Sequence, residues 1–180
     1  MAKKRVRSNP DGFTDLIGRK NVSKSDETLR VIGALDEASA ALGLAKALTN
    51  KPAQKASLEQ AQQGLSLVMA FLAGVSQQSE AAAAIDRFET ALNNLEEEIS
   101  QLESTVEKPH GFIFPGENPS SAALDFARAT TRRAERELVG FSQTVLRLPP
   151  LVLEYLNRLS SLCYLLELAN LSQNADKSGD

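Results

Sequence analysis

The chain has 180 residues, of which 42% are hydrophobic and 24% charged, which is ordinary for one globular domain. Its 20 basic and 23 acidic side chains give a net charge of −3, which excludes a general attraction to nucleic acid or an acidic membrane. Because there is one histidine and one cysteine, the chain cannot form a multi-histidine metal site or an internal disulfide framework.

No targeting or membrane segment is expected. The basic start, MAKKRVRSNP, is not followed by the apolar run of a signal peptide. No apolar stretch approaches the roughly 20 residues that span a bilayer. A single thiol also fits a reducing compartment. We therefore expect a cytoplasmic protein with neither membrane nor nucleic-acid partners.

In chain order, the sequence predicts an extended arm, a helical domain and a short tail. Residues 1–25 contain glycine and proline and fit no helix, and residues 174–180 are polar and expected to be disordered. Between them, helical periodicity predicts five helices, at about 26–49, 54–78, 80–106, 119–140 and 150–173. Short links between five long helices indicate one all-α bundle domain over residues 26–173.

The helix ends carry recognisable signals. Ser25 or Asp26 is suited to cap the first helix, because a short polar side chain accepts hydrogen bonds from the first free N–H groups. Pro119 falls in the first turn of the fourth helix, where a missing N–H does no harm. Gly140 is suited to end that helix.

The fourth helix contains the segment FARATTRRAEREL, residues 126–138, which concentrates arginine in an acidic protein. On a helical wheel, one narrow face is apolar and predicted to meet the core; it consists of Leu124, Ala127, Thr131, Ala134 and Leu138. Beside this face, a ridge forms at i, i+4 and i+8 from Arg128, Arg132 and Arg136, with Glu135 within it. Arg133 points nearly away from the core.

Two interpretations of this ridge remain open. It is either a solvated flank with Arg–Glu pairs worth a few tenths of a kcal/mol each, or a binding site for an anion. The ridge has no lysine, and its three arginines repel one another, so we expect an anionic partner. The planar guanidinium group binds carboxylate or phosphate at two points. This anionic partner is expected to be a polyphosphate, or an acidic residue of another helix or subunit.

A candidate acidic partner lies in the first helix. The residue pattern predicts that one face of this helix contacts the core, through Leu35, Ala38, Leu42 and Ala45. A second face carries small residues and one charge; it consists of Gly33, Asp36, Ala40, Gly43 and Ala47. Small residues allow close approach by another backbone or a ligand, although glycine within a helix costs about 1 kcal/mol. Tight helix packing alone explains the glycines, but it does not explain Asp36.

Three blocks of sequence resemble one known family. The first comprises TDLIG (14–18), NVSK (21–24), GALDE (33–37) and LGLA (42–45). The second comprises FIFPG (112–116) and ARATTRRAER (127–136), and the third is YLNRLS (155–160). Over about residues 11–170, the chain resembles the PduO-type ATP:cob(I)alamin adenosyltransferases, which are trimers of five-helix, ferritin-like bundles.

The resemblance implies an activity. The family transfers the 5′-deoxyadenosyl group of ATP to the Co(I) centre of cobalamin, giving adenosylcobalamin and triphosphate, at a site between subunits of a homotrimer. ATP, Mg²⁺ and cobalamin as substrate are thus the implied ligands, and a reductase partner is left open. Since Co(I) is itself a strong nucleophile, the enzyme needs no Ser, Cys or His nucleophile. It needs cations that neutralise the leaving triphosphate.

The resemblance also implies residue roles. Asp36 and Arg128 would pair across the subunit boundary, contact the corrinoid and contribute to catalysis with Arg132. Phe112 would lie below the corrin ring and displace the lower axial ligand of cobalt, although its type alone also fits a core residue in a loop. The residues implied in ATP binding are Lys24, Arg132, Glu135, Arg136 and Asn157. Mg²⁺ would bind with ATP, not through side chains alone. His110 is expected on a surface loop, and Cys163 as a buried thiol.

The arm departs from the family pattern T-x-T-G-D-x-G-x-T, which here reads RSNPDGFT, residues 7–14. The remaining candidates for ATP binding are Ser8, Asp11, Gly12 and Thr14. Pro10 removes an N–H group from the loop, and Phe13 is bulky. Two interpretations fit this change. The chain is either a working enzyme with a variant loop, or a relative that binds corrinoid or nucleotide without turnover, as a carrier or regulator. A helical scaffold without a ligand is a third interpretation.

Overall fold

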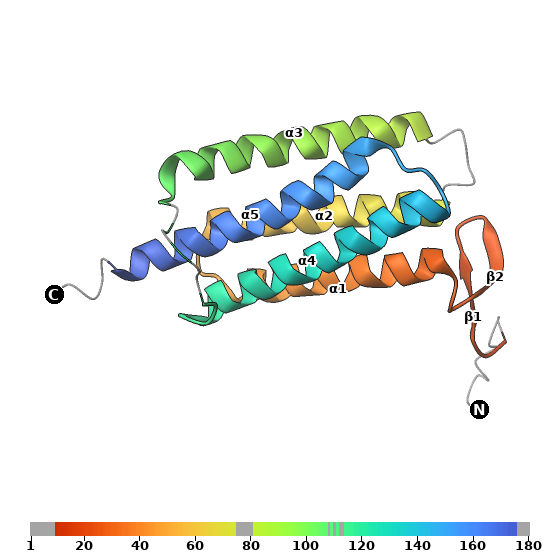
Figure 1. Cartoon of the computed structure of the whole chain (residues 1–180), viewed down its shortest axis with the longest axis horizontal. Helices are drawn as coiled ribbons and strands as arrows, with labels where there is room; N and C mark the ends of the chain where they lie inside the picture. Colours follow the sequence, from red (N-terminus) through yellow and green to blue (C-terminus); the bar gives the residue numbers. More distant parts are fainter. Residues whose placement is uncertain (1–9, 75–80, 108, 110, 112–113, 176–180) are drawn as a thin grey trace, which may run out of the picture.

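The computed structural model describes residues 10–74, 81–107, 109, 111 and 114–175. Its elements are β1 (Phe13–Leu16), β2 (Arg19–Ser23), α1 (Glu27–Leu48), α2 (Pro52–Gly74), α3 (Ala81–Thr105), α4 (Pro119–Thr144) and α5 (Pro150–Ala175). The five helices run side by side along the long axis of the molecule, with the β1–β2 hairpin at one end (Figure 1). The prediction of an all-α five-helix bundle is confirmed. No helix of the described segments is both long and apolar enough to cross a membrane.

The helices pack in a fixed order of neighbours. α4 lies between α1 and α5, α1 also packs on α2, and α3 packs mainly on α5. In Figure 1, α3 and α1 therefore lie on opposite sides of the bundle. This order leaves α1 and α4 together on one side, with α5 as the other neighbour of α4.

The core is built from the faces that the helical periodicity predicts. Leu124, Ala127 and Leu138 of α4 are fully buried, as are Leu35 and Leu42 of α1. Burying one leucine side chain contributes about 1.5–3 kcal/mol relative to exposing it. The core therefore fixes the rotation of α4, and with it the direction of the arginine ridge.

Helix boundaries lie close to the predictions except at the end of the fourth helix. The predicted end of the second helix, near residue 78, lies outside the described residues. Asp26 caps α1 by accepting a hydrogen bond from the Thr28 N–H at 2.8 Å. The Thr28 side chain lowers the pKa of the Asp26 carboxyl most, and the Thr28 N–H and Arg19 act in the same direction. The prediction that the fourth helix ends near Gly140 is wrong, because α4 continues to Thr144. Phe141 is buried in the core, so burial of its ring stabilises the additional turn.

The arm forms a structure that the sequence pattern missed. Residues 10–25 are extended as expected, but β1 and β2 pair in an antiparallel hairpin, with Thr14 opposite Val22. Gly18 in the turn has a φ of 73°, a region that suits glycine. The first nine residues lie outside the described residues.

A buried polar network joins four helices at the end of the bundle opposite the hairpin (Figure 1). Thr49 donates to Gln54 at 2.7 Å, Gln54 donates to Asn170 at 3.0 Å, and Asn170 donates to Ser120 at 3.0 Å. Because each partner is satisfied, the network fixes the relative register of these helix ends.

Candidate active site

Arg128 is held within its own chain. Its Nε and Nη2 groups both donate to Oδ1 of Asp125, at 2.9 and 2.6 Å, and both side chains are partly buried. Asp36, which the family resemblance pairs with Arg128 across subunits, is exposed on α1 and has no partner among the described residues. Within one chain Arg128 therefore pairs with Asp125, and a contact to Asp36 of a second subunit stays a prediction.

The next arginines along α4 differ in their surroundings. Arg133 forms a salt bridge to Glu37 of α1, so it links two helices. Arg132 and Arg136 are exposed, and neither has a hydrogen bond or a salt bridge within the part of the chain that the structure describes. Two unpaired guanidinium groups one turn apart offer a binding site for phosphate oxygens.

Glu135 and Asn157 come together as the family resemblance implies. The Asn157 amide on α5 donates to Oε1 of Glu135 on α4 at 2.9 Å. Asn157 is exposed, and Glu135 is partly buried. Glu135 stands between Arg132 and Arg136 in the α4 sequence, and its bond to Asn157 joins α4 to α5 here. We call these four residues, Arg132, Glu135, Arg136 and Asn157, the α4–α5 seam.

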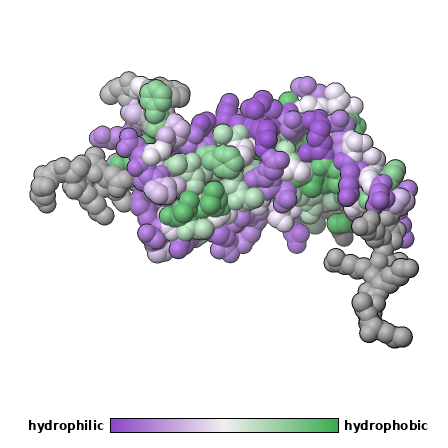
Figure 2. Space-filling model, turned by 90° about the horizontal axis from the view of Figure 1, so that it is seen from below, coloured by the Kyte–Doolittle hydropathy of each residue, from purple (hydrophilic) through white to green (hydrophobic). Residues whose placement is uncertain are grey.

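The exposed side of α1 and α4 carries apolar residues. Leu44 and Leu48 are 49% and 42% exposed, and Phe126 of α4 is 54% exposed. Figure 2, which views the molecule from this side, shows an apolar area bordered by polar residues, toward the end opposite the hairpin. Asp36 lies on the same helix as the two leucines. An apolar area of this kind is typical of a surface that another protein chain covers.

A cavity of about 570 Å³ lies between α3, α4 and α5 and includes two of the predicted arginines. Its main polar residues are Glu103, Asp125, Arg128, Arg132, Arg158, Ser160, Ser161, Tyr164 and Glu167. Gly111 and Pro115, of the loop that precedes α4, border it. Arg158 is held by Glu96 of α3, at 2.5 and 2.7 Å. The cavity thus joins the arginine helix to the end of the YLNRLS block.

Glu167 was missed by the sequence analysis. It is 3% exposed and borders this cavity. Burial and the nearby Asp125 raise the pKa of its carboxyl to about 7, while Arg128 acts in the opposite direction. The available signal was a single glutamate inside the apolar run LCYLLELANL, residues 162–171.

The arm residues lie at a different place. Asp11, Gly12 and Lys24 are exposed in the hairpin, where the Lys24 N–H donates to the Gly12 carbonyl at 2.8 Å. The hairpin adjoins the start of α1, at the opposite end of the bundle from the loop between α3 and α4 (Figure 1). Ser8, His110 and Phe112 lie outside the described residues, so their predicted roles stay predictions.

Cys163 is fully buried, and burial raises the pKa of its thiol to about 12. The prediction of a buried thiol is confirmed. No three His, Cys, Asp or Glu residues of the described ranges are grouped as metal ligands.

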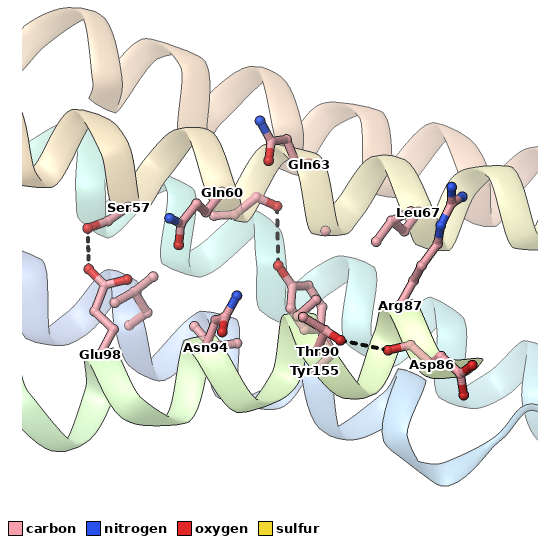
Figure 3. Close-up of a pocket in the computed structure, with 15 residues that line it drawn as sticks. Ser57, Gln60, Gln63, Leu67, Asp86, Arg87, Thr90, Asn94, Glu98 and Tyr155 are labelled. Carbon is pink, nitrogen blue, oxygen red and sulfur yellow. Dashed lines mark hydrogen bonds between the residues drawn. The ribbon is translucent and has the colours of Figure 1, made fainter. Parts of the chain in front are cut away.

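A second cavity, of about 470 Å³, lies between α2 and α3 (Figure 3). Tyr155 of α5 enters it and donates to the Ala61 carbonyl at 3.4 Å, and a hydrogen bond from Ser57 to Glu98 joins the two helices. The amide side chains of Gln60, Gln63 and Asn94 are also among its lining. None of the site residues that the sequence predicts borders this cavity, so it is separate from the candidate active site.

The structure defines a five-helix bundle with exposed arginines on α4 beside α5. The model of the cobalamin adenosyltransferase family matches residues 5–169, and the chain belongs to that family. The chain is 34% identical over 171 residues to corrinoid adenosyltransferase PduO of Citrobacter freundii, across 91% of this chain and 48% of that protein. It thus spans about half the length of this curated relative. A corrinoid adenosyltransferase of Mycobacterium leprae is 33% identical over 170 residues, across 89% and 87% of the two chains.

Solved structures agree with this assignment. A variant PduO-type ATP:corrinoid adenosyltransferase from Lactobacillus reuteri, complexed with cobalamin and ATP, superposes with a TM-score of 0.76 at 28% identity and covers 91% of both chains. Another variant of that protein, complexed with ATP, gives a TM-score of 0.77 at 29% identity, over 88% of this chain and 89% of its own. The fold prediction is therefore confirmed along nearly the whole chain.

Proposed function

We propose that this chain is a corrinoid adenosyltransferase that transfers the 5′-deoxyadenosyl group of ATP to Co(I) of cobalamin. The observation that carries the proposal is the α4–α5 seam, where Glu135 bonds to Asn157 and follows or precedes the unpaired Arg132 and Arg136 on the same helix. Family membership and the neighbouring structures complexed with cobalamin and ATP support it.

The proposed reaction is a nucleophilic displacement at C5′ of ATP. A Co–C5′ bond forms from the electron pair of Co(I), and the C5′–O5′ bond breaks, so that triphosphate leaves with that bond's electron pair. Arg132 and Arg136 would neutralise the growing negative charge on the phosphates. Mg²⁺ would bind chiefly through phosphate oxygens and water, as it prefers. Glu135 and Asn157 would orient the nucleoside, because positioning of C5′ over cobalt is the other requirement.

We propose further that the site is completed by a partner subunit in a homotrimer. The exposed apolar residues of α1 and the unpaired Asp36 support an interface on this side. The hairpin adjoins the start of α1, at the opposite end of the bundle from the start of α4 (Figure 1), and we infer that Asp11, Gly12, Thr14 and Lys24 would contact ATP at an interface. Phe112 would act at the corrin ring, and the enzyme would work in the cytoplasm, with or without a reductase.

An anaerobic assay tests the proposal. Purified protein is mixed with ATP, Mg²⁺ and chemically reduced cobalamin, and the visible spectrum is followed for the cobalt–carbon product. We expect product from the wild type and almost none from Arg132→Ala, with Arg87→Ala on the exposed side of α3 as the matched control. Absence of product from the wild type, together with absence of ATP binding by calorimetry, would overturn the proposal.

The alternative is a relative that binds corrinoid or nucleotide without turnover. Pro10 and Phe13 of the arm favour it, because Pro10 has no N–H for a phosphate and the Phe13 ring is 38% exposed. Binding of ATP or cobalamin by calorimetry, with no cobalt–carbon product in the same assay, would support this alternative.

A further inference from the structure

The cavity between α2 and α3, which the proposed reaction does not use, lies between two contacts that join these helices. At one end, the Ser57 hydroxyl donates to the Glu98 carboxylate. Toward the other end, the rings of Phe71 and Phe88 pack edge to face, with their centroids 5.7 Å apart. Between the two contacts the helices enclose a space of about 470 Å³ (Figure 3). This volume lies within the roughly 300–1,000 Å³ that is typical of sites for small molecules.

The inner wall of this cavity is apolar and includes several short side chains. Ala61 and Gly64 of α2 line it together with Ala91 of α3, and none of these side chains is long enough to fill the space between the helices. The buried Leu95 and Leu162 complete the wall. An apolar wall with a few placed polar groups is the usual composition of a site for an organic ligand.

Three polar side chains of the cavity have hydrogen-bonding capacity left. Tyr155 is 2% exposed, and its hydroxyl donates to the Ala61 carbonyl at 3.4 Å but accepts no hydrogen bond from the described residues. The amides of Gln60 on α2 and Asn94 on α3 lie in the gap between the two helices (Figure 3), and neither has a hydrogen bond within the described segments. A buried hydroxyl oxygen accepts from an N–H group, and carboxamides pair with both N–H and C=O groups.

The charged residues of the lining favour a neutral ligand. Glu98 is engaged by Ser57, and Asp86 and Arg87, which are adjacent in the chain, offset each other in charge. Shape favours a planar ligand, because a flat ring between two helices places its faces on the short apolar side chains. The edges of such a ring then meet the polar groups.

We propose that the cavity between α2 and α3 binds a neutral, fused heteroaromatic ring system. A ring N–H group of this ligand donates to the Tyr155 hydroxyl oxygen, and N–H and C=O groups at its edge pair with the amides of Gln60 and Asn94. Carboxamide side chains bind the edge of such rings at two points, as they do with adenine. No residue of the α4–α5 seam borders the cavity, so this site is separate from the candidate active site and does not depend on the proposed function.

The first experiment uses lumichrome as the probe, because it is a neutral, fluorescent, fused-ring compound with N–H and C=O groups at one edge. We expect its fluorescence anisotropy to rise to saturation as the full chain is added. Ala91→Leu, which fills the cavity from α3, should weaken binding at least about tenfold. Ala56→Leu, the same change on the exposed side of α2, should leave binding unchanged. Absence of saturable binding to the wild type, or equal binding to Ala91→Leu, would overturn the proposal.

The second experiment tests the polar contacts. Tyr155→Phe keeps the ring but removes the hydroxyl, and we expect it to weaken lumichrome binding about threefold or more. Tyr164→Phe, which removes the hydroxyl at the other cavity, is the control. Gln60→Ala changes an exposed side chain and leaves the core intact, so it tests the same contacts if Tyr155→Phe fails to fold. Unchanged affinity in the folded variants would overturn the proposal, as would displacement of lumichrome by excess ATP and Mg²⁺, because the probe would then occupy the ATP site.

Discussion

The amide of Asn157 on α5 donates to the carboxylate of Glu135 on α4 across 2.9 Å, which fixes the orientation of these two side chains. This bond joins residues of two separate sequence blocks, ARATTRRAER and YLNRLS, on one surface. Neither side chain is deeply buried, so the bond adds little to the stability of the fold. Its consequence is orientation of the polar groups that meet a ligand at the seam.

We expect Asn157→Ala to raise KM for ATP about tenfold, which corresponds to the loss of about 1.4 kcal/mol of binding free energy. The melting temperature should change little, because Asn157 is exposed. Steady-state rates at saturating reduced cobalamin measure the effect. Asn93→Ala, which removes an exposed amide from α3, serves as control and should leave KM unchanged. An unchanged KM in Asn157→Ala would show that the seam does not contact ATP.

Two adjacent acidic residues of α1 make it possible to distinguish contacts within the chain from contacts between chains. Glu37 pairs with Arg133 of the same chain, whereas Asp36 has no partner among the described residues. We expect Asp36→Ala to weaken self-association about tenfold or more, because it would leave a charge unpaired at the proposed interface. Glu37→Ala should have a smaller effect, since exposed salt bridges contribute at most about 1 kcal/mol. Sedimentation equilibrium measures both, and equal effects would contradict the proposed role of Asp36.

The predictable part of the structure is the part that periodicity controls. The core face of α4 was identified because helix geometry places Leu124, Ala127 and Leu138 on one side. The same geometry located the arginine ridge next to that face. The end of α4 was predicted wrongly at Gly140, because a glycine suits a helix end but does not enforce one when a buried aromatic residue follows.

The site residues that the sequence did not reveal depend on contacts between helices. Asp125 stands three residues before Arg128, so their pairing was open to prediction from spacing, whereas Glu167 reaches the same place from another helix. Its burial depends on how α4 and α5 pack, and one sequence does not specify that packing. The hairpin was missed because β1 has four residues, too few to show a strand period reliably.

Gly64 should be required because it leaves space for the Tyr155 side chain to pack in the core. A Cβ atom at Gly64 would lie 1.8 Å from the Tyr155 hydroxyl oxygen, so Gly64→Ala forces the buried ring to move. We expect a loss of about 1–3 kcal/mol in the free energy of unfolding, as for an overpacked core. Gly140→Ala is the control, because nothing lies within 4 Å of its added Cβ and helix propensity favours alanine by about 1 kcal/mol. Urea denaturation should therefore give opposite signs for the two variants.

The stability of the chain should depend on the charge of Glu167 above neutral pH. Its pKa rises from the model-compound value of 4.5 to about 7 in the folded chain, so the folded state holds a proton that the unfolded state has released. The stability that this group contributes is complete below pH 4.5 and is lost as the pH rises through 7. At about 1.4 kcal/mol per pKa unit, the loss amounts to roughly 3–4 kcal/mol.

Glu167→Gln should remove this loss, because the amide is neutral at every pH and close to the carboxyl group in shape. We expect the variant to equal the wild type near pH 4 and to exceed it at pH 8.5 by about 3–4 kcal/mol in the free energy of unfolding. Urea denaturation across this range measures the difference. Glu97→Gln, with the same change of charge on the exposed side of α3, should parallel the wild type at both pH values. If Glu167→Gln is the less stable protein at pH 8.5, the ionised carboxylate stabilises the fold through Arg128, and burial is then not the dominant influence on its pKa.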